Sequence, residues 1–183
     1  MSDLLLSIDP GARGCGCAWW VRAEGSWVLL HARYAAAPEG KGETGPSEWG
    51  AAVAAVEAAS LDVLGALRPD VVVVERMQVY TRSKCDPRDL LALAAIGGGL
   101  FRAFSDARPV GPLPREWKQS VPRDILGNRV EAKLRDPSRL PPGVVATWGA
   151  VRVPSRKTHL NDVLHGIGLG LWYAALARPA FSP

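Results

Sequence analysis

Four consecutive valines, Val71–Val74, followed directly by Glu75, constrain the fold of this chain more than any other segment. A run of β-branched residues without polar alternation is typical of a parallel strand that is covered on both faces. The run Leu4–Asp9 (LLLSID) has the same form, and Pro10-Gly11 stops it. We therefore expect an α/β fold in which two buried strands each end in a carboxylate.

The remaining segments predict a mixed five-stranded sheet, α/β in class and flanked by helices on both faces. Strands at 17–22 and 26–33 flank Glu24-Gly25, a hairpin signal that predicts an antiparallel meander after a turn at 12–16. A fifth strand is expected at 108–113, and helices at 47–67, 87–104, 114–121 and 158–177. The predicted helix starts are Ser47, Asp86-Pro87, Asn128 for a further helix, and Thr158.

Composition bounds the class of protein. The chain has 183 residues, of which 48% are hydrophobic and 22% charged, so we expect one globular domain over 1–183. The N-terminus has no signal-peptide pattern, and the apolar stretches fall short of a membrane span, so we expect a cytoplasmic protein without membrane association. The net charge of +4 is modest, but basic residues concentrate between 76 and 133 and indicate a polyanion partner: Arg76, Arg82, Lys84, Arg88, Arg115, Lys118, Arg123, Arg129 and Lys133.

Asp9, Glu75, His159 and Asp162 form the candidate catalytic set. The first two end buried strands, where open sheets bind ligands, and the last two are three residues apart on one face of a late helix. Gathered carboxylates need a cation, and their hard oxygens suit Mg²⁺ or Mn²⁺, with an imidazole favouring Mn²⁺. Phosphodiester hydrolysis by two divalent ions is the chemistry this pattern predicts. His165, three residues further on, reaches either the site or only its rim.

Each of these residues also has a structural interpretation. Asp9 precedes Pro-Gly and is of a type common in turns. Glu75 is placed to pair with Arg76, and Asp162 to stabilise the first turn of a helix through its dipole. His159 and His165 are each also compatible with a hydrogen-bonded helix residue. The joint pattern, more than any one position, favours a metal site.

Four segments in order resemble the RuvC-like Holliday junction resolvases of the RNase H-like superfamily: IDPGARGCG, VVVVERMQVY, PREWKQSV and HLNDVLHGIGLGLWY. The resemblance covers nearly the whole chain and implies a Mg²⁺-dependent crossover junction endonuclease with two ions per site. It implies Asp9, Glu75, His159 and Asp162 as metal ligands, and symmetric cleavage that leaves a 5′-phosphate and a 3′-hydroxyl. It also implies a homodimer, for which the helix containing Gly97–Gly99 is our candidate contact.

The same resemblance suggests roles for basic and aromatic residues. Lys118 matches a lysine that the family uses near the scissile phosphate and is included in the catalytic set, with Arg129 or Lys133 as a second basic group. Tyr80 is the nearest match to an aromatic residue that stacks at the junction crossover. The expected DNA-binding residues are Tyr80, Arg82, Lys84, Arg115, Lys118, Arg129 and Lys133. An ordinary strand-end tyrosine and a solvated helix face are the alternative interpretations.

The Pro/Gly-rich segment 140–154 departs from the family pattern. Its extended pieces, 144–148 and 150–153, suggest a small hairpin, and Trp148 within it has no assigned role. We infer a bacterial or phage-encoded enzyme acting in the bacterial cytoplasm on four-way or branched DNA. Two alternatives stay open: an RNase H-like nuclease for flaps or RNA–DNA hybrids, and a non-catalytic DNA-binding module of the same fold.

Overall fold

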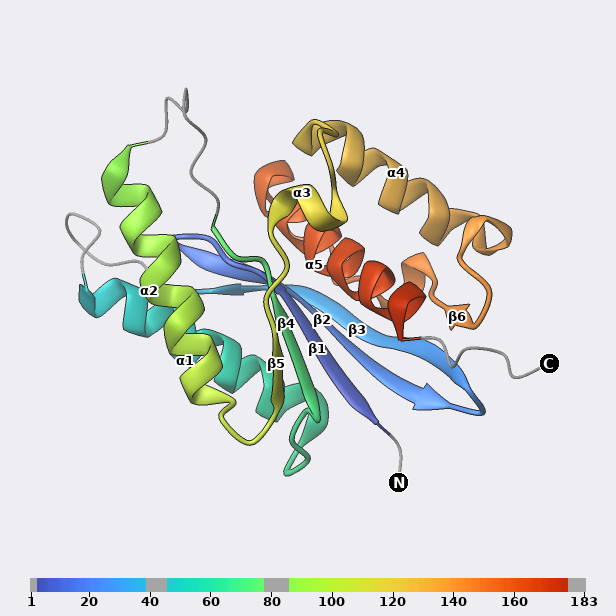
Figure 1. The fold of residues 1–183 in the computed structure, drawn as a ribbon, viewed down its shortest axis with the longest axis horizontal. Helices are drawn as coiled ribbons and strands as arrows, with labels where there is room; N and C mark the ends of the chain where they lie inside the picture. Colours follow the sequence, from blue (N-terminus) through green and yellow to red (C-terminus); the bar gives the residue numbers. More distant parts are fainter. Residues whose placement is uncertain (1–2, 39–45, 78–85, 178–183) are drawn as a thin grey trace.

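A computed structural model describes residues 3–38, 46–77 and 86–177. Its sheet has six strands in the order β5-β4-β1-β2-β3-β6 (Figure 1). The strands are β1 (Leu4–Asp9), β2 (Gly14–Ala23), β3 (Ser26–Ala36), β4 (Val71–Val74), β5 (Arg108–Val110) and β6 (Val144–Val145). The helices are α1 (Pro46–Leu64), α2 (Pro87–Ala103), α3 (Pro114–Trp117), α4 (Arg123–Arg135) and α5 (Lys157–Leu176), with 3₁₀ turns η1 (Pro137–Arg139) and η2 (Trp148–Ala150).

Helices cover both faces of the sheet, as predicted. α1 and α2 pack on one face, and α5 packs on the other, with α4 stacked outside it (Figure 1). The four valines of β4 are all buried and alternate between two cores: Val72 and Val74 face α1 and α2, whereas Val71 and Val73 face α5. β4 pairs in parallel with β1 and β5, which confirms the expectation of a doubly covered parallel strand.

The first three strands form the predicted antiparallel meander. Glu24 and Gly25, with φ of 49° and 79°, make the tight turn between β2 and β3, in which both central residues have positive φ. β2 starts at Gly14, earlier than predicted, and the expected turn at 12–16 is correspondingly shorter. The reason is that residues 14–16 continue the ladder with β3, where Gly14 pairs with Ala36.

The segment 140–154 does not form the predicted hairpin. β6 instead adds a sixth strand by pairing in parallel with the edge of β3, with Val144 opposite Trp27. Further along, Arg152 donates its backbone N–H to the carbonyl of Ala32 at 2.8 Å, and η2 lies between these two contacts. An open sheet edge offers unpaired backbone groups, and the segment pairs with that edge instead of folding into two strands of its own, while turn hydrogen bonds such as that from the N–H of Val144 to the carbonyl of Pro141 stay within it.

Trp148 acquires a structural role in this arrangement. The guanidinium of Arg135, at the end of α4, lies 4.3 Å from the centroid of its ring. This cation–π contact ties the inserted segment to α4.

Several predicted helix starts are displaced. Asp86 caps α2 as expected, because its carboxylate accepts the N–H of Arg88 at 2.8 Å. Asn128, however, lies in the middle of α4, which begins at Arg123 after Pro122. Thr158 is the second residue of α5, and Ser47 lies inside the first turn of α1.

α2 continues unbroken through Gly97–Gly99. A Cβ atom on Gly99 would lie 2.9 Å from Cγ2 of Val53, so close packing against α1 explains this glycine. Gly97 and Gly98 have open space where a Cβ would be, and their role is not explained by packing within the described chain.

Candidate active site

Asp9 and Glu75 lie next to each other at one edge of the sheet, because β1 and β4 are parallel neighbours and each ends at its carboxylate. Ile8 pairs with Val74, and the N–H of Glu75 donates to the carbonyl of Ile8 at 3.2 Å. The two side chains are only 10% and 14% exposed. Burial raises the pKa of Glu75, and the negative charge of Asp9 raises it further.

Asp162 joins this edge because α5 packs unusually close to the sheet. A Cβ atom on Gly16 would overlap the carbonyl oxygen of Asp162, and one on Gly166 would lie 2.6 Å from the carbonyl oxygen of Gly16. The hydroxyl of Ser7 donates to the carbonyl of Gly166 at 2.7 Å and holds the helix in this position. Two glycines facing each other thus let strand and helix backbones touch, and the contact sets the start of α5 beside Asp9.

Arg123 supplies positive charge between two of the carboxylates. Its guanidinium lies 3.7 Å from Oδ2 of Asp9 and forms an ion pair and hydrogen bond with Asp162. Its side chain is 58% exposed, whereas those of the two acids are 10% and 15% exposed. The guanidinium therefore closes the cluster from the solvent side.

Glu75 has a second set of partners, both from α3 and its end. Nζ of Lys118 donates to the two carboxylate oxygens at 2.9 and 3.0 Å, and Nε1 of Trp117 donates to Oε2 at 2.7 Å. Both contacts favour the ionised carboxylate and lower the pKa of Glu75, against the larger effect of its burial. Lys118 therefore lies at the candidate site, where the sequence placed it.

The histidine that contacts a carboxylate of the site is His165, for which the sequence left open whether it reaches the site or only its rim. It is 1% exposed, and its Nδ1 lies 3.5 Å from Oδ2 of Asp9. Its Nε2 lies 3.1 Å from the carbonyl oxygen of Arg123, and because a carbonyl only accepts, Nε2 carries a proton. The rings of His165 and Trp117 also form a T-shaped contact, with centroids 6.0 Å apart.

His159 lies six residues before His165 on α5 and faces a different neighbour. Its ring stacks on Tyr34 at 3.9 Å between centroids and 5° between planes. Partial burial, and then the charge of Arg156, lower the pKa of His159. In this conformation no contact joins His159 to Asp9, Glu75 or Asp162 among the described residues.

Sequence reasoning did not assign Arg123 and Trp117 to the site. Arg123 was one of many basic residues in the segment 76–133, and nothing local marks it as the partner of two carboxylates. Trp117 was read only as part of a motif. Both depend on how α3 and α4 fold back over α5, which is a tertiary arrangement without a local pattern.

The carboxylate donors suit a hard divalent cation. In this conformation, however, cationic side chains lie against these carboxylates. Within residues 3–38, 46–77 and 86–177, no three acidic, histidine or cysteine side chains converge closely enough to hold one ion. The three carboxylates are instead compensated by Lys118 and Arg123. A divalent ion carries the same kind of compensating charge, so the donor set fits such an ion once the guanidinium withdraws.

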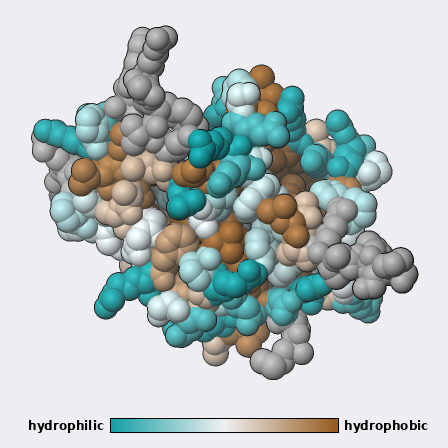
Figure 2. All heavy atoms as spheres, in the orientation of Figure 1, coloured by the Kyte–Doolittle hydropathy of each residue, from teal (hydrophilic) through white to brown (hydrophobic). Residues whose placement is uncertain are grey.

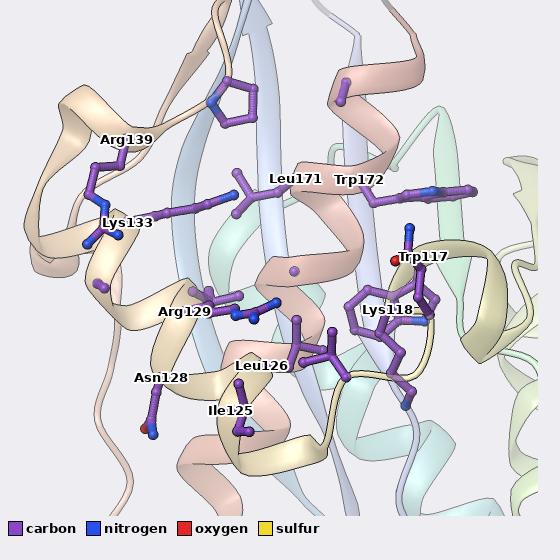
Figure 3. Close-up of a pocket in the computed structure, with 17 residues that line it drawn as sticks. Trp117, Lys118, Ile125, Leu126, Asn128, Arg129, Lys133, Arg139, Leu171 and Trp172 are labelled. Atoms are coloured by element: carbon purple, nitrogen blue, oxygen red, sulfur yellow. The ribbon is translucent and has the colours of Figure 1, made fainter.

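The predicted DNA-binding residues fall into three groups. Arg129 and Lys133 line a groove of about 700 Å³ between α4 and α5, which Lys118 also lines (Figure 3). Arg115 is exposed and lines a shallower hollow with Lys118 and Gln119. Tyr80, Arg82 and Lys84 lie outside the described residues. Figure 2 shows hydrophilic side chains over much of one face, with apolar side chains as separate spots between them.

Comparison with known proteins supports the fold but does not assign the chain to a family. No family model and no curated protein sequence matches the chain. Solved structures do match. RuvC of Thermus thermophilus in complex with a Holliday junction substrate has 22% identity and a TM-score of 0.60, over 96% of this chain and 95% of that one.

Two further structures agree. A second T. thermophilus RuvC structure has 24% identity and a TM-score of 0.52, over 96% and 95% of the two chains. The yeast mitochondrial Holliday junction resolvase Ydc2 has 14% identity and a TM-score of 0.57, over 94% of this chain and 79% of that one. The chain thus has the RuvC-type, RNase H-like fold that its sequence predicted. None of the helices in the described part of the chain has the length and apolar character needed to span a bilayer.

Proposed function

We propose that this protein is a divalent-metal-dependent endonuclease that cuts branched DNA, with the four-way junction as its main substrate. The observation that carries the proposal is the position of Asp9 and Glu75 at neighbouring strand ends, with Asp162 joined to Asp9 through Arg123 and with Lys118 bonded to Glu75. Buried carboxylates that need compensating charge are costly to a fold and typical of a reaction centre. The RuvC-type fold, and a solved RuvC bound to a Holliday junction substrate, support branched DNA as the ligand.

Asp9, Glu75 and Asp162 would hold the ions, with Mg²⁺ or Mn²⁺ as the metal, two per site. His159 is the proposed fourth ligand, because it shares a face of α5 with Asp162, and it would have to leave Tyr34 to take that role. His165 is a positioning residue in this scheme, since it links Asp9 to the backbone of Arg123. When bound, the ions would supply the positive charge and water activation that phosphodiester hydrolysis requires.

The chain's own residues would prepare the centre in two ways. Lys118 and Trp117 orient the carboxylate of Glu75 and favour its ionised form by donating hydrogen bonds to it. Arg123 balances the charge of Asp9 and Asp162, and its exposed guanidinium is free to turn toward a phosphate. Arg115, Arg129 and Lys133 would bind the DNA backbone nearby, together with Tyr80, Arg82 and Lys84.

A symmetric junction calls for a symmetric enzyme, and we propose a homodimer. The outward face of α2 is the candidate contact, because Leu91 is 63% exposed and Ala94, Ala95 and Gly98 are exposed along the same helix. Small residues on such a face let a second helix approach closely. Sedimentation of the wild type against Leu91→Lys measures this, with a shift to monomer as the expected result.

The function is tested by cutting assays on labelled DNA with Mg²⁺ or Mn²⁺. A mobile four-way junction should be cut in symmetric pairs of strands, well before linear duplex, flap or RNA–DNA hybrid of the same sequence. The nicked products should be sealed by a ligase, since the proposal predicts a 5′-phosphate and a 3′-hydroxyl. Equal cutting rates on all of these substrates would contradict the resolvase proposal and favour a general RNase H-like nuclease.

Matched variants separate catalysis from binding. Asp9→Asn and Glu75→Gln should abolish cutting and retain junction binding in a gel-shift assay. Asp106→Asn is the control, since this exposed acid lies in the turn before β5, at the opposite end of that strand from the site. If the wild type and all variants bind junctions and none cuts with either metal, the protein is a binding module.

A further inference from the structure

The groove between α4 and α5 has a mixed character that phosphate contacts alone do not require. Its volume is about 700 Å³, and its wall and floor carry apolar or aromatic side chains from both helices and from the loop before α4. These include Val121, Leu126, Val130, Leu171, Trp172 and Ala175. Figure 3 shows Arg129 and Lys133 extending from α4 across this floor toward α5.

The charge on the groove has one sign. Lys118, Arg129, Lys133 and Arg139 line it, and no aspartate or glutamate is among the described residues that do. Lys118 is bonded to Glu75, whereas the other three form no ion pair within the described part of the chain. Three uncompensated cations around an apolar floor favour a ligand that is anionic along one side and flat and apolar on the other.

The groove adjoins the candidate active site through α3. Trp117 contributes to both, because its Nε1 binds Glu75 while its ring lines the groove next to Gly168. Lys118 likewise lines the groove and holds Glu75. A DNA strand whose phosphate reaches the carboxylates thus has a cationic path from Lys118 past Arg129 and Lys133 to Arg139.

We propose that this groove binds an unstacked nucleotide of the DNA strand that enters the active site. The base would lie on Trp172 and Leu171, and its phosphates would pair with Arg129 and Lys133, which are one helical turn apart on α4. Branched DNA supplies such bases at its crossover, whereas intact duplex does not. The inference rests on the proposed function and adds to it a base-binding subsite.

An acidic peptide with an apolar anchor residue is also anionic on one side and apolar on the other, so it would suit the same groove. The observation that favours DNA is the continuity of the groove with Lys118 and Glu75, because a strand held at the carboxylates must leave along a neighbouring surface. A peptide would have no reason to lie against the candidate catalytic lysine. The peptide therefore enters as a competing outcome of the experiment.

The test measures binding of short single strands to the full-length protein. One probe is a thymidine octamer with a central 2-aminopurine, and the other is an octamer of the same charge whose central nucleotides are abasic. Stacking in the groove predicts about tenfold tighter binding of the first probe, with quenching of its 2-aminopurine fluorescence. Trp172→Leu should remove most of this difference and leave binding of the abasic probe unchanged.

Charge variants provide a second, independent readout. Arg139→Glu lies on an exposed turn and should weaken both probes alike and reduce the slope of log affinity against log salt by about one or more. Arg135→Glu is the matched control, because it makes the same change of charge at a residue that is paired with Glu131 and packs on Trp148 outside the groove. Its effect should be clearly smaller than that of Arg139→Glu.

Three results would overturn the proposal. The first is equal binding of the two probes by the wild type, and the second is an unchanged base preference in Trp172→Leu. The third is competition for the groove by an acidic peptide but not by the octamer. Junction cutting by the same preparations keeps the two ideas apart: cutting without base preference refutes only the subsite, and base preference without cutting refutes only the nuclease.

Discussion

The contact between Gly16 and α5 gives the sharpest test of how this fold builds its site. Replacing Gly16 by alanine adds one Cβ atom, which would overlap the carbonyl oxygen of Asp162 and lie 2.6 Å from the backbone nitrogen of Val163. Carbon and nitrogen atoms in contact prefer about 3.5 Å, so helix and strand must separate by about 1 Å or more. Both neighbours are backbone atoms, so no side chain can rotate to relieve the overlap.

The cost follows from what the separation loosens. Overpacking of a tight interior costs about 1–3 kcal/mol. Weakening the hydrogen bond from Ser7 to the carbonyl of Gly166 adds about 1 kcal/mol, because both groups are buried. We expect Gly16→Ala to lower the free energy of unfolding by about 2–4 kcal/mol, and the melting temperature by roughly 10 °C for a domain of this size.

Urea denaturation followed by circular dichroism measures this loss. Gly50→Ala is the matched control, since Gly50 lies inside α1 with nothing within 4 Å of its absent Cβ. The same chemical change should stabilise the protein there by about 1 kcal/mol. If Gly16→Ala is as stable as the wild type, the close approach of α5 to β2 is wrong, and with it the placement of Asp162.

Three further predictions concern charge, burial and capping. In urea denaturation with EDTA, Arg123→Gln should lower the free energy of unfolding by about 1–2 kcal/mol, which is below the cost for a fully buried pair because the guanidinium is 58% exposed. Adding Mn²⁺ should restore the lost stability. Equal stability of the variant and the wild type in EDTA would contradict the charge-balance argument. Burial raises the pKa of Cys15 to about 12 and that of Cys17 well above its usual value, so at pH 8 both are protonated. In a Cys85→Ser background a disulfide-exchange reagent should therefore label neither thiol until denaturant is added, and rapid native labelling would refute their burial. Asp86→Ala should cost about 1 kcal/mol through loss of the α2 cap, whereas Asp86→Asn should cost less, as thermal melts would show.

The parts of the fold that the sequence predicted are those with a local signal. Val71–Val74 could only be a buried strand, and Glu24-Gly25 could only be a tight turn, so the meander and the parallel strand follow from neighbouring residues. For β6 the sequence indicated an extended piece at 144–148 but not its partner, because the pairing of Val144–Val145 depends on the free edge of β3. The start of α4 at Arg123 was missed because Asn128 is a good cap by type, while Pro122 already fixes the chain direction six residues earlier.

The same division applies to the site. Asp9 and Glu75 could be paired from sequence, since the ends of parallel neighbouring strands must meet. His165 and His159 could not be told apart, because both lie on α5 within one turn of Asp162. Which of them reaches Asp9 depends on the depth at which Gly166 seats the helix against Gly16, and that depth is a property of two backbones and not of a spacing.

Basic residues at the end of α3 and the start of α4 show that counting charges in the sequence does not tell which of them are available to bind DNA. The sequence assigns Lys118 to the scissile phosphate and counts Arg123 only among the basic residues that indicate a polyanion partner, yet in the folded chain each is bonded to a carboxylate of the site. Three carboxylates that are at most 15% exposed lie at this edge of the sheet, and buried negative charge is costly without compensation, so we expect these two cations to support folding before any DNA arrives. Arg129 and Lys133 have no such partner among the described residues, and under our proposal they are the cations that bind the DNA. Removing either of the first pair should therefore change stability and cutting together, whereas removing either of the second should change only binding and its dependence on salt.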